Sequence, residues 1–169
     1  AVYFAEKEIN WASSEEASFG LITSILIIQF IAIPGAYAHS WLSSKLGNMK
    51  ALMISLHMWI ILCFIAWFIT EPIHFYFTAG FVGFIMGGIQ SLSRSTYSKM
   101  LPDTQDHTSY FSFYDVCEKI GLVIGTFSFG FIEGITNNMR NSILALASFF
   151  IIGLLLLFLV PPSNVKNHS

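Results

Sequence analysis

The chain has 169 residues, of which 54% are hydrophobic, 16% aromatic and only 11% charged, and its mean hydropathy is +0.66. Its net charge of −2 excludes the strongly basic surface that nucleic-acid binding needs. The two cysteines and five histidines form neither a disulfide framework nor a metal-ligand spacing, so we expect no metal or other cofactor. A chain this apolar has too few polar residues to cover a water-soluble fold.

Apolar residues come in five blocks, each about long enough to cross the hydrocarbon core of a bilayer, which takes a helix of about 20 residues. The blocks cover residues 19–37, 51–70, 73–92, 110–132 and 143–160. Five buried helices of a soluble protein would leave almost no polar residues to face water. The sequence therefore predicts an all-α, polytopic membrane protein, in which residues 1–169 form one bundle of five transmembrane helices in a lipid bilayer.

The connections between the blocks are short and leave no room for a soluble domain. Glu71 and Pro72 alone join the second and third spans, which predicts that these helices are antiparallel neighbours. The segment Leu101–Thr104, which contains Pro102, should end any helical continuation of the third span. The chain begins Ala-Val-Tyr and continues into an acidic stretch, without the basic start of a cleavable signal. We therefore expect a fragment of a longer protein.

Lysine and arginine gather on one side of the expected membrane. The segments that follow the first, third and fifth spans lie on the same side and contain five basic residues, namely Lys45, Lys50, Arg94, Lys99 and Lys166. The segments on the other side contain two, Lys7 and Arg140. Because basic residues favour the cytoplasmic side, the sequence predicts an N-terminus outside and a cytoplasmic C-terminus.

Small residues recur at four-residue spacing in the third and fourth spans, which lets helix backbones approach closely or leaves room for a cavity. The candidate packing residues are Gly83, Gly87, Gly121 and Gly125. The first span contains Gln29 and the helix-weakening pair Pro34-Gly35, which indicates a bend. The second and fifth spans are almost uniformly apolar. We expect the first, third and fourth spans to lie inside the protein and the other two at its periphery.

Three ionisable residues, Asp115, Glu118 and Lys119, lie on one face of the fourth span. Charges at membrane depth face the bundle interior, pair with each other or line a wet path. Asp115 and Lys119 could form a neutral structural pair, but one lysine cannot neutralise both acids. Either Arg94 supplies the second cation, or one carboxylate is protonated and able to carry a proton.

Three segments of the chain resemble a known family. Residues 87–95 (GGIQSLSRS), 99–102 (KMLP) and 112–119 (SFYDVCEK) are similar to the late part of major facilitator superfamily transporters. The similar branch contains the autophagy-related vacuolar amino-acid effluxers and their bacterial relatives. The superfamily's cytoplasmic loop motif is also partly present, since Lys45, Gly47 and Lys50 match it while Ser40 and Ser44 replace its glycine and aspartate.

The resemblance implies helices eight to twelve of a twelve-helix secondary transporter, with the N-terminal half of the same protein as the missing partner and a bacterial inner membrane as its location. It implies transport of a small polar solute, with an amino acid as one candidate, by alternating access. Coupling or gating, possible proton transfer included, would fall to Arg94, Asp115, Glu118 and Lys119, and solute contact to Gln29, Gln90 and Ser91.

A second function fits the same residues, and a third does not. A non-transporting membrane subunit could use the same charges only to assemble with a partner. A membrane-embedded enzyme needs a nucleophile with a base at workable spacing, and the sequence shows no such pair, so we expect no enzymatic activity.

Overall fold

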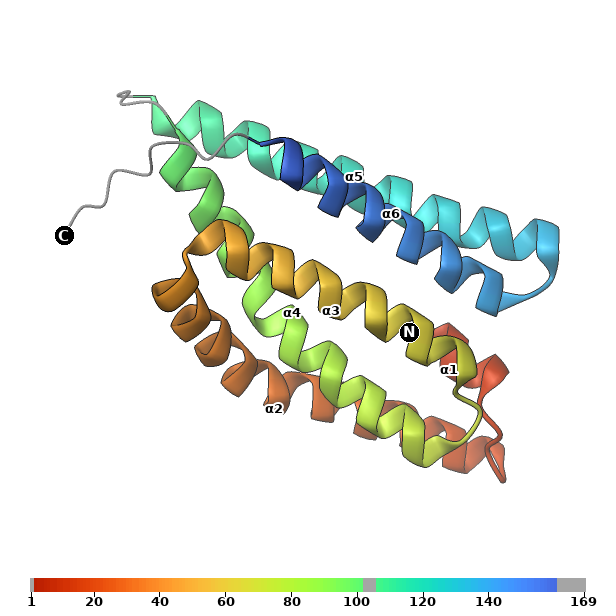
Figure 1. Ribbon diagram of the computed structural model, residues 1–169. Helices are drawn as coiled ribbons and strands as arrows, with labels where there is room; N and C mark the ends of the chain where they lie inside the picture. The colour runs from red at the N-terminus through yellow and green to blue at the C-terminus, as the bar shows by residue number, and fades with distance from the viewer. Residues whose placement is uncertain (1, 102–105, 161–169) are drawn as a thin grey trace.

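The computed structural model describes residues 2–101 and 106–160, with side chains from Phe4 onward, and nearly all of this part of the chain is helical (Figure 1). Five helices in it are long and apolar enough to cross a membrane, which confirms the predicted fold class. In chain order the helices are α1 (Val2–Glu8), α2 (Ser14–Leu46), α3 (Asn48–Phe68), α4 (Pro72–Met100), α5 (His107–Thr136) and α6 (Met139–Leu159).

Two of the helices extend well beyond the apolar blocks that predicted them. Helix α2 begins at Ser14, where the Ser13 hydroxyl accepts a hydrogen bond from the Glu16 amide at 3.1 Å, a typical N-cap. It continues through Pro34 and ends before Gly47, whose positive φ of 84° suits a residue without a side chain. In Figure 1, α2 curves along its second half. The helix thus continues on both sides of the apolar block at residues 19–37 that predicted it.

The helices pack in series across the bundle. Helix α4 packs against α2 on one side and α3 on the other, α3 packs against α6, and α6 against α5 (Figure 1). The short turn before Pro72, the first residue of α4, makes α3 and α4 antiparallel neighbours. Helix α4 ends at Met100 with Leu101 as its C-cap, while the proline that predicted this end lies outside the described residues.

Glycines allow α2 and α4 to touch backbone to backbone. A Cβ atom at Gly87 would overlap the carbonyl of Ala32, and one at Gly83 would lie 2.5 Å from the carbonyl oxygen of Ile28. From the other helix, a Cβ at Gly35 would overlap the backbone of Phe84. Side chains at these positions would force the helices apart, so the α2–α4 interface depends on the glycines.

The end of the bundle that holds α1 is closed by a second set of contacts. Arg140 pairs with Glu8 at 2.9 Å and donates to the carbonyl oxygens of Trp67 and Ile69 at the end of α3. Lys7 pairs with Glu133 of α5 at 3.1 Å. These contacts join α1, α3, α5 and α6 above an apolar cluster that includes Phe4, Ile9, Phe75 and Met139.

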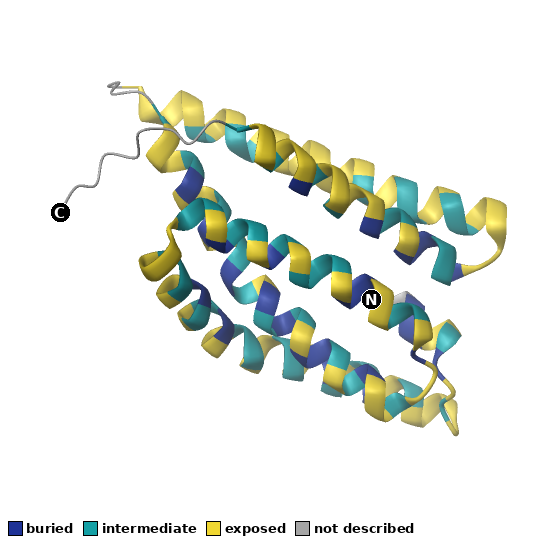
Figure 2. Ribbon diagram, in the orientation of Figure 1, coloured by how far each residue is buried: buried dark blue, intermediate teal, exposed yellow. Residues whose placement is uncertain are grey.

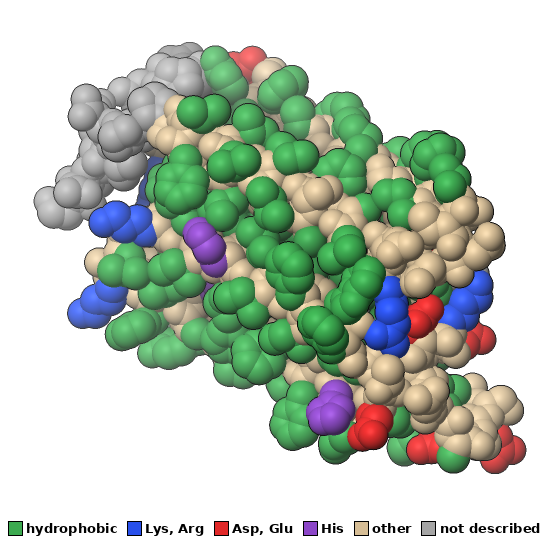
Figure 3. All heavy atoms as spheres, turned by 45° about the vertical axis from the view of Figure 1, so that its right-hand side comes forward, with side chains coloured by type: hydrophobic (Ala, Val, Ile, Leu, Met, Phe, Trp, Pro, Cys, Tyr) green, Lys and Arg blue, Asp and Glu red, His purple; other side chains and the backbone are tan. Residues whose placement is uncertain are grey.

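Burial is distributed unevenly among the helices. Figure 2 shows buried residues along α2, α3, α4 and α6, whereas none of the residues of α5 is buried. The space-filling view shows hydrophobic side chains over most of the visible surface (Figure 3), as expected of helices that face lipid or further helices. The prediction that α5 lies inside the protein therefore stays a prediction, since this chain alone does not cover it.

Candidate functional site: a polar cleft between α4 and α5

Helices α4 and α5 meet at one end, and polar side chains make the contact. The Arg94 guanidinium donates to both carboxylate oxygens of Asp115, at 3.0 and 3.3 Å. One residue before Arg94, the Ser93 hydroxyl accepts a hydrogen bond from the Tyr114 hydroxyl at 2.9 Å. Further along, the Tyr97 hydroxyl donates to the carbonyl oxygen of Tyr110 at 2.9 Å. The charged pair is thus supported by two tyrosines.

Aromatic rings hold the Arg94 guanidinium in place. Its central carbon lies 5.6 Å from the ring centre of Phe111 and 5.9 Å from that of Tyr114, within the range of cation–π attraction. The side chains of Arg94 and Asp115 are 53% and 48% exposed, so solvent would screen the pair. An ion pair with this exposure contributes about 1 kcal/mol or less to stability, which leaves it free to exchange partners.

A cleft of about 550 Å³ opens beside this pair and is lined by both helices. Its polar side chains come from α4 (Gln90, Ser91, Ser93, Arg94) and from α5 (Tyr114, Glu118). Together with Asp115, the site holds one cation and two carboxylates, so the cluster carries one excess negative charge when both acids are ionised. Such a site can hold a proton or a cationic group next to Glu118, and a carboxylate next to Arg94.

The structure brings together some of the residues singled out from the sequence and separates others. Arg94, Glu118, Gln90 and Ser91 share the cleft, and Asp115 adjoins it through Arg94. Gln29 is exposed on α2 and does not line it, and neither does Lys119. Among the described residues, no ion pair involves Glu118 or Lys119. Asp115 is therefore paired by Arg94, and not by the lysine one turn along its own helix.

Two polar residues of the cleft, Ser93 and Tyr114, were not among the candidates from the sequence. A signal for Tyr114 was present, because it precedes Glu118 by four residues and therefore lies on the same face of α5. Ser93 gave no such signal. Its role depends on the neighbouring helix, which the sequence of α4 alone does not reveal.

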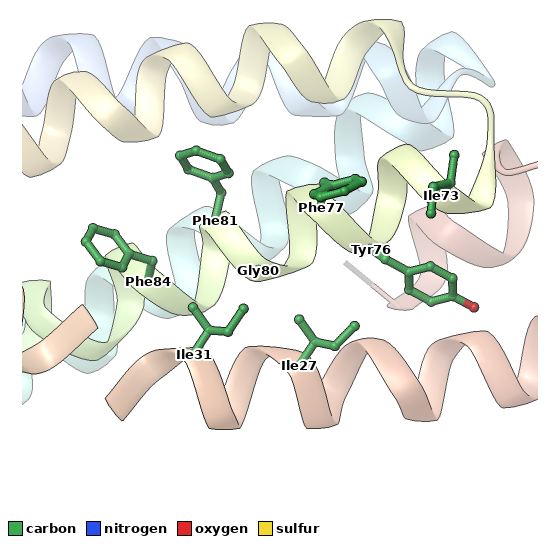
Figure 4. Close-up of a pocket in the computed structure, with 8 residues that line it drawn as sticks. All are labelled: Ile27, Ile31, Ile73, Tyr76, Phe77, Gly80, Phe81 and Phe84. Carbon is green, nitrogen blue, oxygen red and sulfur yellow. The ribbon is translucent and has the colours of Figure 1, made fainter. Parts of the chain in front are cut away.

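A second, apolar groove of about 610 Å³ lies between α2 and α4 (Figure 4). Figure 4 shows Ile27 and Ile31 of α2 directed toward α4, whereas Phe77 and Phe81 lie on the side of α4 away from α2 in this view. The lining is almost wholly hydrocarbon, which suits lipid chains or another helix and not a polar solute.

A comparison with known protein families agrees with a bundle of membrane helices. Residues 1–168 match the family described as "Vacuole effluxer Atg22 like", so the chain belongs to the Atg22-like family of transporters of the major facilitator type. This confirms the family that the three sequence segments indicated.

Several curated relatives are similar over most of this chain. The "Uncharacterized MFS-type transporter YxiO" of Bacillus subtilis (strain 168) is 26% identical over 152 residues, which make up 90% of this chain and 35% of that protein. The "Autophagy-related protein 22" of Pichia angusta is 26% identical over 89% of this chain and 28% of its own length. The protein of the same name from Candida glabrata is 24% identical over 99% and 31%.

The chain thus spans about a third of the length of these relatives. No solved structure shows a significant match to it.

Proposed function

We propose that this chain is the C-terminal part, helices eight to twelve, of a secondary transporter that moves a small polar solute across a membrane by alternating access. Family membership supports transport, and the limited coverage of the relatives supports a missing N-terminal half. We further propose that the cleft between α4 and α5 is where solute or proton coupling takes place. An amino acid is one candidate solute, because the cleft offers both a guanidinium and a carboxylate.

The position of Glu118 carries this proposal. Its carboxylate lines the cleft together with Arg94, yet Arg94 makes its ion pair with Asp115. Glu118 is thus available to bind an ammonium group or a proton, while a solute carboxylate would compete with Asp115 for Arg94. A site that exchanges ion-pair partners can couple occupancy to a helix movement, since α4 and α5 meet through this same pair.

The proposed orientation places the N-terminus outside and this cleft toward the cytoplasmic end. In support, Lys45, Lys50, Arg94 and Lys99 belong to the ends of α2 and α4 and the start of α3, which meet at one end of the bundle (Figure 1). Lys7 and Arg140 lie in the network at the other end. The bacterial inner (plasma) membrane is the location we propose.

Glu118→Gln in the full natural protein tests the proposal. We expect normal membrane insertion, because the change removes a charge, and a transport rate altered about ten-fold at some pH between 5 and 8, equivalent to about 1.4 kcal/mol in the transport barrier. Uptake of radiolabelled amino acids into proteoliposomes across that pH range provides the measurement. Glu15→Gln, in the exposed first turn of α2, is the matched control and should leave the profile unchanged.

The same experiment addresses the alternative of a non-transporting subunit. Normal expression with transport unchanged from pH 5 to 8 would reject a coupling role for Glu118. Absence of uptake of every tested solute by the unsubstituted protein, together with co-purification of a partner that depends on Asp115 or Glu118, would favour the subunit.

A further inference from the structure

A third cavity, of about 800 Å³, lies at the end of the bundle where α2 ends, α3 begins and α4 and α6 end. Three lysines line it, Lys45 from α2, Lys50 from α3 and Lys99 from α4. None of its lining residues is acidic. Within residues 2–101 and 106–160, no ion pair involves these lysines. As far as the described residues line it, the cavity is therefore a concentrated positive site without a counter-charge.

Asn48, the first residue of α3, organises the polar part of this cavity. Its side-chain oxygen accepts hydrogen bonds from the Ser43 hydroxyl and from the Lys99 ammonium, the latter at 3.1 Å. Its side-chain amide donates to the Ser95 hydroxyl at 3.0 Å. One residue thus ties α2, α3 and α4 together and holds Lys99 at the cavity. No side chain caps the start of α3, so its first amide groups add further donors for an anion.

The lengths of two helices indicate that the cavity lies at the depth of the lipid headgroups. Helices α3 and α6 each have 21 residues, and at a rise of 1.5 Å per residue each spans about 31 Å, close to the thickness of the hydrocarbon core. The cavity includes the first turn of α3 and the last turn of α6. The lysines are therefore placed where ammonium groups reach the interface.

The remaining wall of the cavity is apolar and reaches further into the membrane. Met53 lies more than one turn along α3 from Asn48, and Phe158 lies in the last turn of α6. Figure 3 shows basic side chains at the ends of the molecule and a largely hydrophobic surface between them. The site thus combines a cationic rim at headgroup level with a hydrocarbon wall directly beneath it.

We propose that this cavity binds an anionic phospholipid, with the headgroup phosphate at Lys45, Lys50 and Lys99 and an acyl chain along Met53 and Phe158. Basic pockets between membrane helices recognise anionic headgroups through the same charges. A free phosphate ion shares the headgroup chemistry but would leave the apolar wall unused, which is why the geometry favours the lipid. A bound lipid would bridge α2, α3, α4 and α6 at one end.

The test is lipid retention by the full natural protein in detergent, measured by native mass spectrometry with dioleoyl phosphatidylglycerol and dioleoyl phosphatidylcholine. We expect preferential binding of phosphatidylglycerol. Lys99→Gln should weaken it about five-fold and Lys50→Gln/Lys99→Gln about 25-fold, at about 1 kcal/mol per basic residue near an anionic headgroup. Lys99→Arg should retain most of the binding, because the charge remains.

Lys7→Gln, which removes one lysine from the opposite end of the bundle, is the matched control and should not change the preference. The unfolding temperature of each variant without added lipid shows that the fold is intact. Equal binding by the unsubstituted protein and the double variant would overturn the proposal, and so would an equal loss in Lys7→Gln. Displacement of phosphatidylglycerol by excess inorganic phosphate would assign the site to a free anion and would also overturn it.

Discussion

Helices α4 and α5 carry the same sequence pattern and have opposite environments. Each has glycines four residues apart, at 83 and 87 in α4 and at 121 and 125 in α5. In α4 a Cβ at Gly83 or Gly87 would overlap or crowd the backbone of α2, whereas a Cβ at Gly121 or Gly125 of α5 would meet no neighbouring element within 4 Å. Helix α4 has eight buried residues and α5 has none.

The comparison shows that four-residue glycine spacing permits close packing of two helix backbones but does not ensure it. Removing side chains at every fourth position creates a groove into which another backbone can fit. The groove stays empty unless a helix is present to enter it, and for α4 that helix is α2. The polar cleft joins these two helices. Ser93 and Arg94 belong to the closely packed α4, while Tyr114 and Glu118 belong to the exposed α5.

The largest expected effect comes from filling the groove of α4. Gly87→Val would place a branched side chain against the Ala32 carbonyl, and we expect a loss of about 3 kcal/mol in unfolding free energy, because backbone cannot move aside as a flexible side chain can. Thermal unfolding of the full natural protein in detergent measures this loss. Gly153→Val in α6, where nothing lies within 4 Å, is the control. Equal stability of the two variants would contradict the packed interface.

A smaller effect is expected where α4 touches α5. Tyr114→Phe removes the hydroxyl that donates to Ser93, and we expect a loss of about 1 kcal/mol or less, as for a single hydrogen bond within a membrane protein. The same unfolding assay applies, with Tyr37→Phe as the control because Tyr37 is 77% exposed on α2. A loss as large as that of Gly87→Val would show that α4 and α5 are as firmly joined as α2 and α4.

Apolar length and turn chemistry were enough to predict the five helices and the α3–α4 hairpin. Hydropathy marks only the apolar part of a helix, so it did not show how far α2 and α4 extend beyond the predicted spans. Charge spacing predicted that Asp115 and Lys119 share a face, but it could not show which cation Asp115 would choose. That choice depends on α4, where one guanidinium nitrogen of Arg94 donates to both Asp115 oxygens and two aromatic rings lie against the guanidinium.

Gly121→Ala should have the smallest effect. It tests most directly whether another helix packs on the glycine face of α5. Nothing in the described structure would touch the added methyl group, so in residues 1–169 expressed alone we expect a slight gain of about 0.5 kcal/mol from the better helix propensity of alanine. In the full natural protein the proposed N-terminal part supplies further helices, and a helix packed on this face would turn the gain into a loss. Unfolding in detergent of both proteins, each with and without the substitution, gives the sign. A gain in both would show that the glycines of α5 face lipid, and that the spacing shared with α4 has no packing role there.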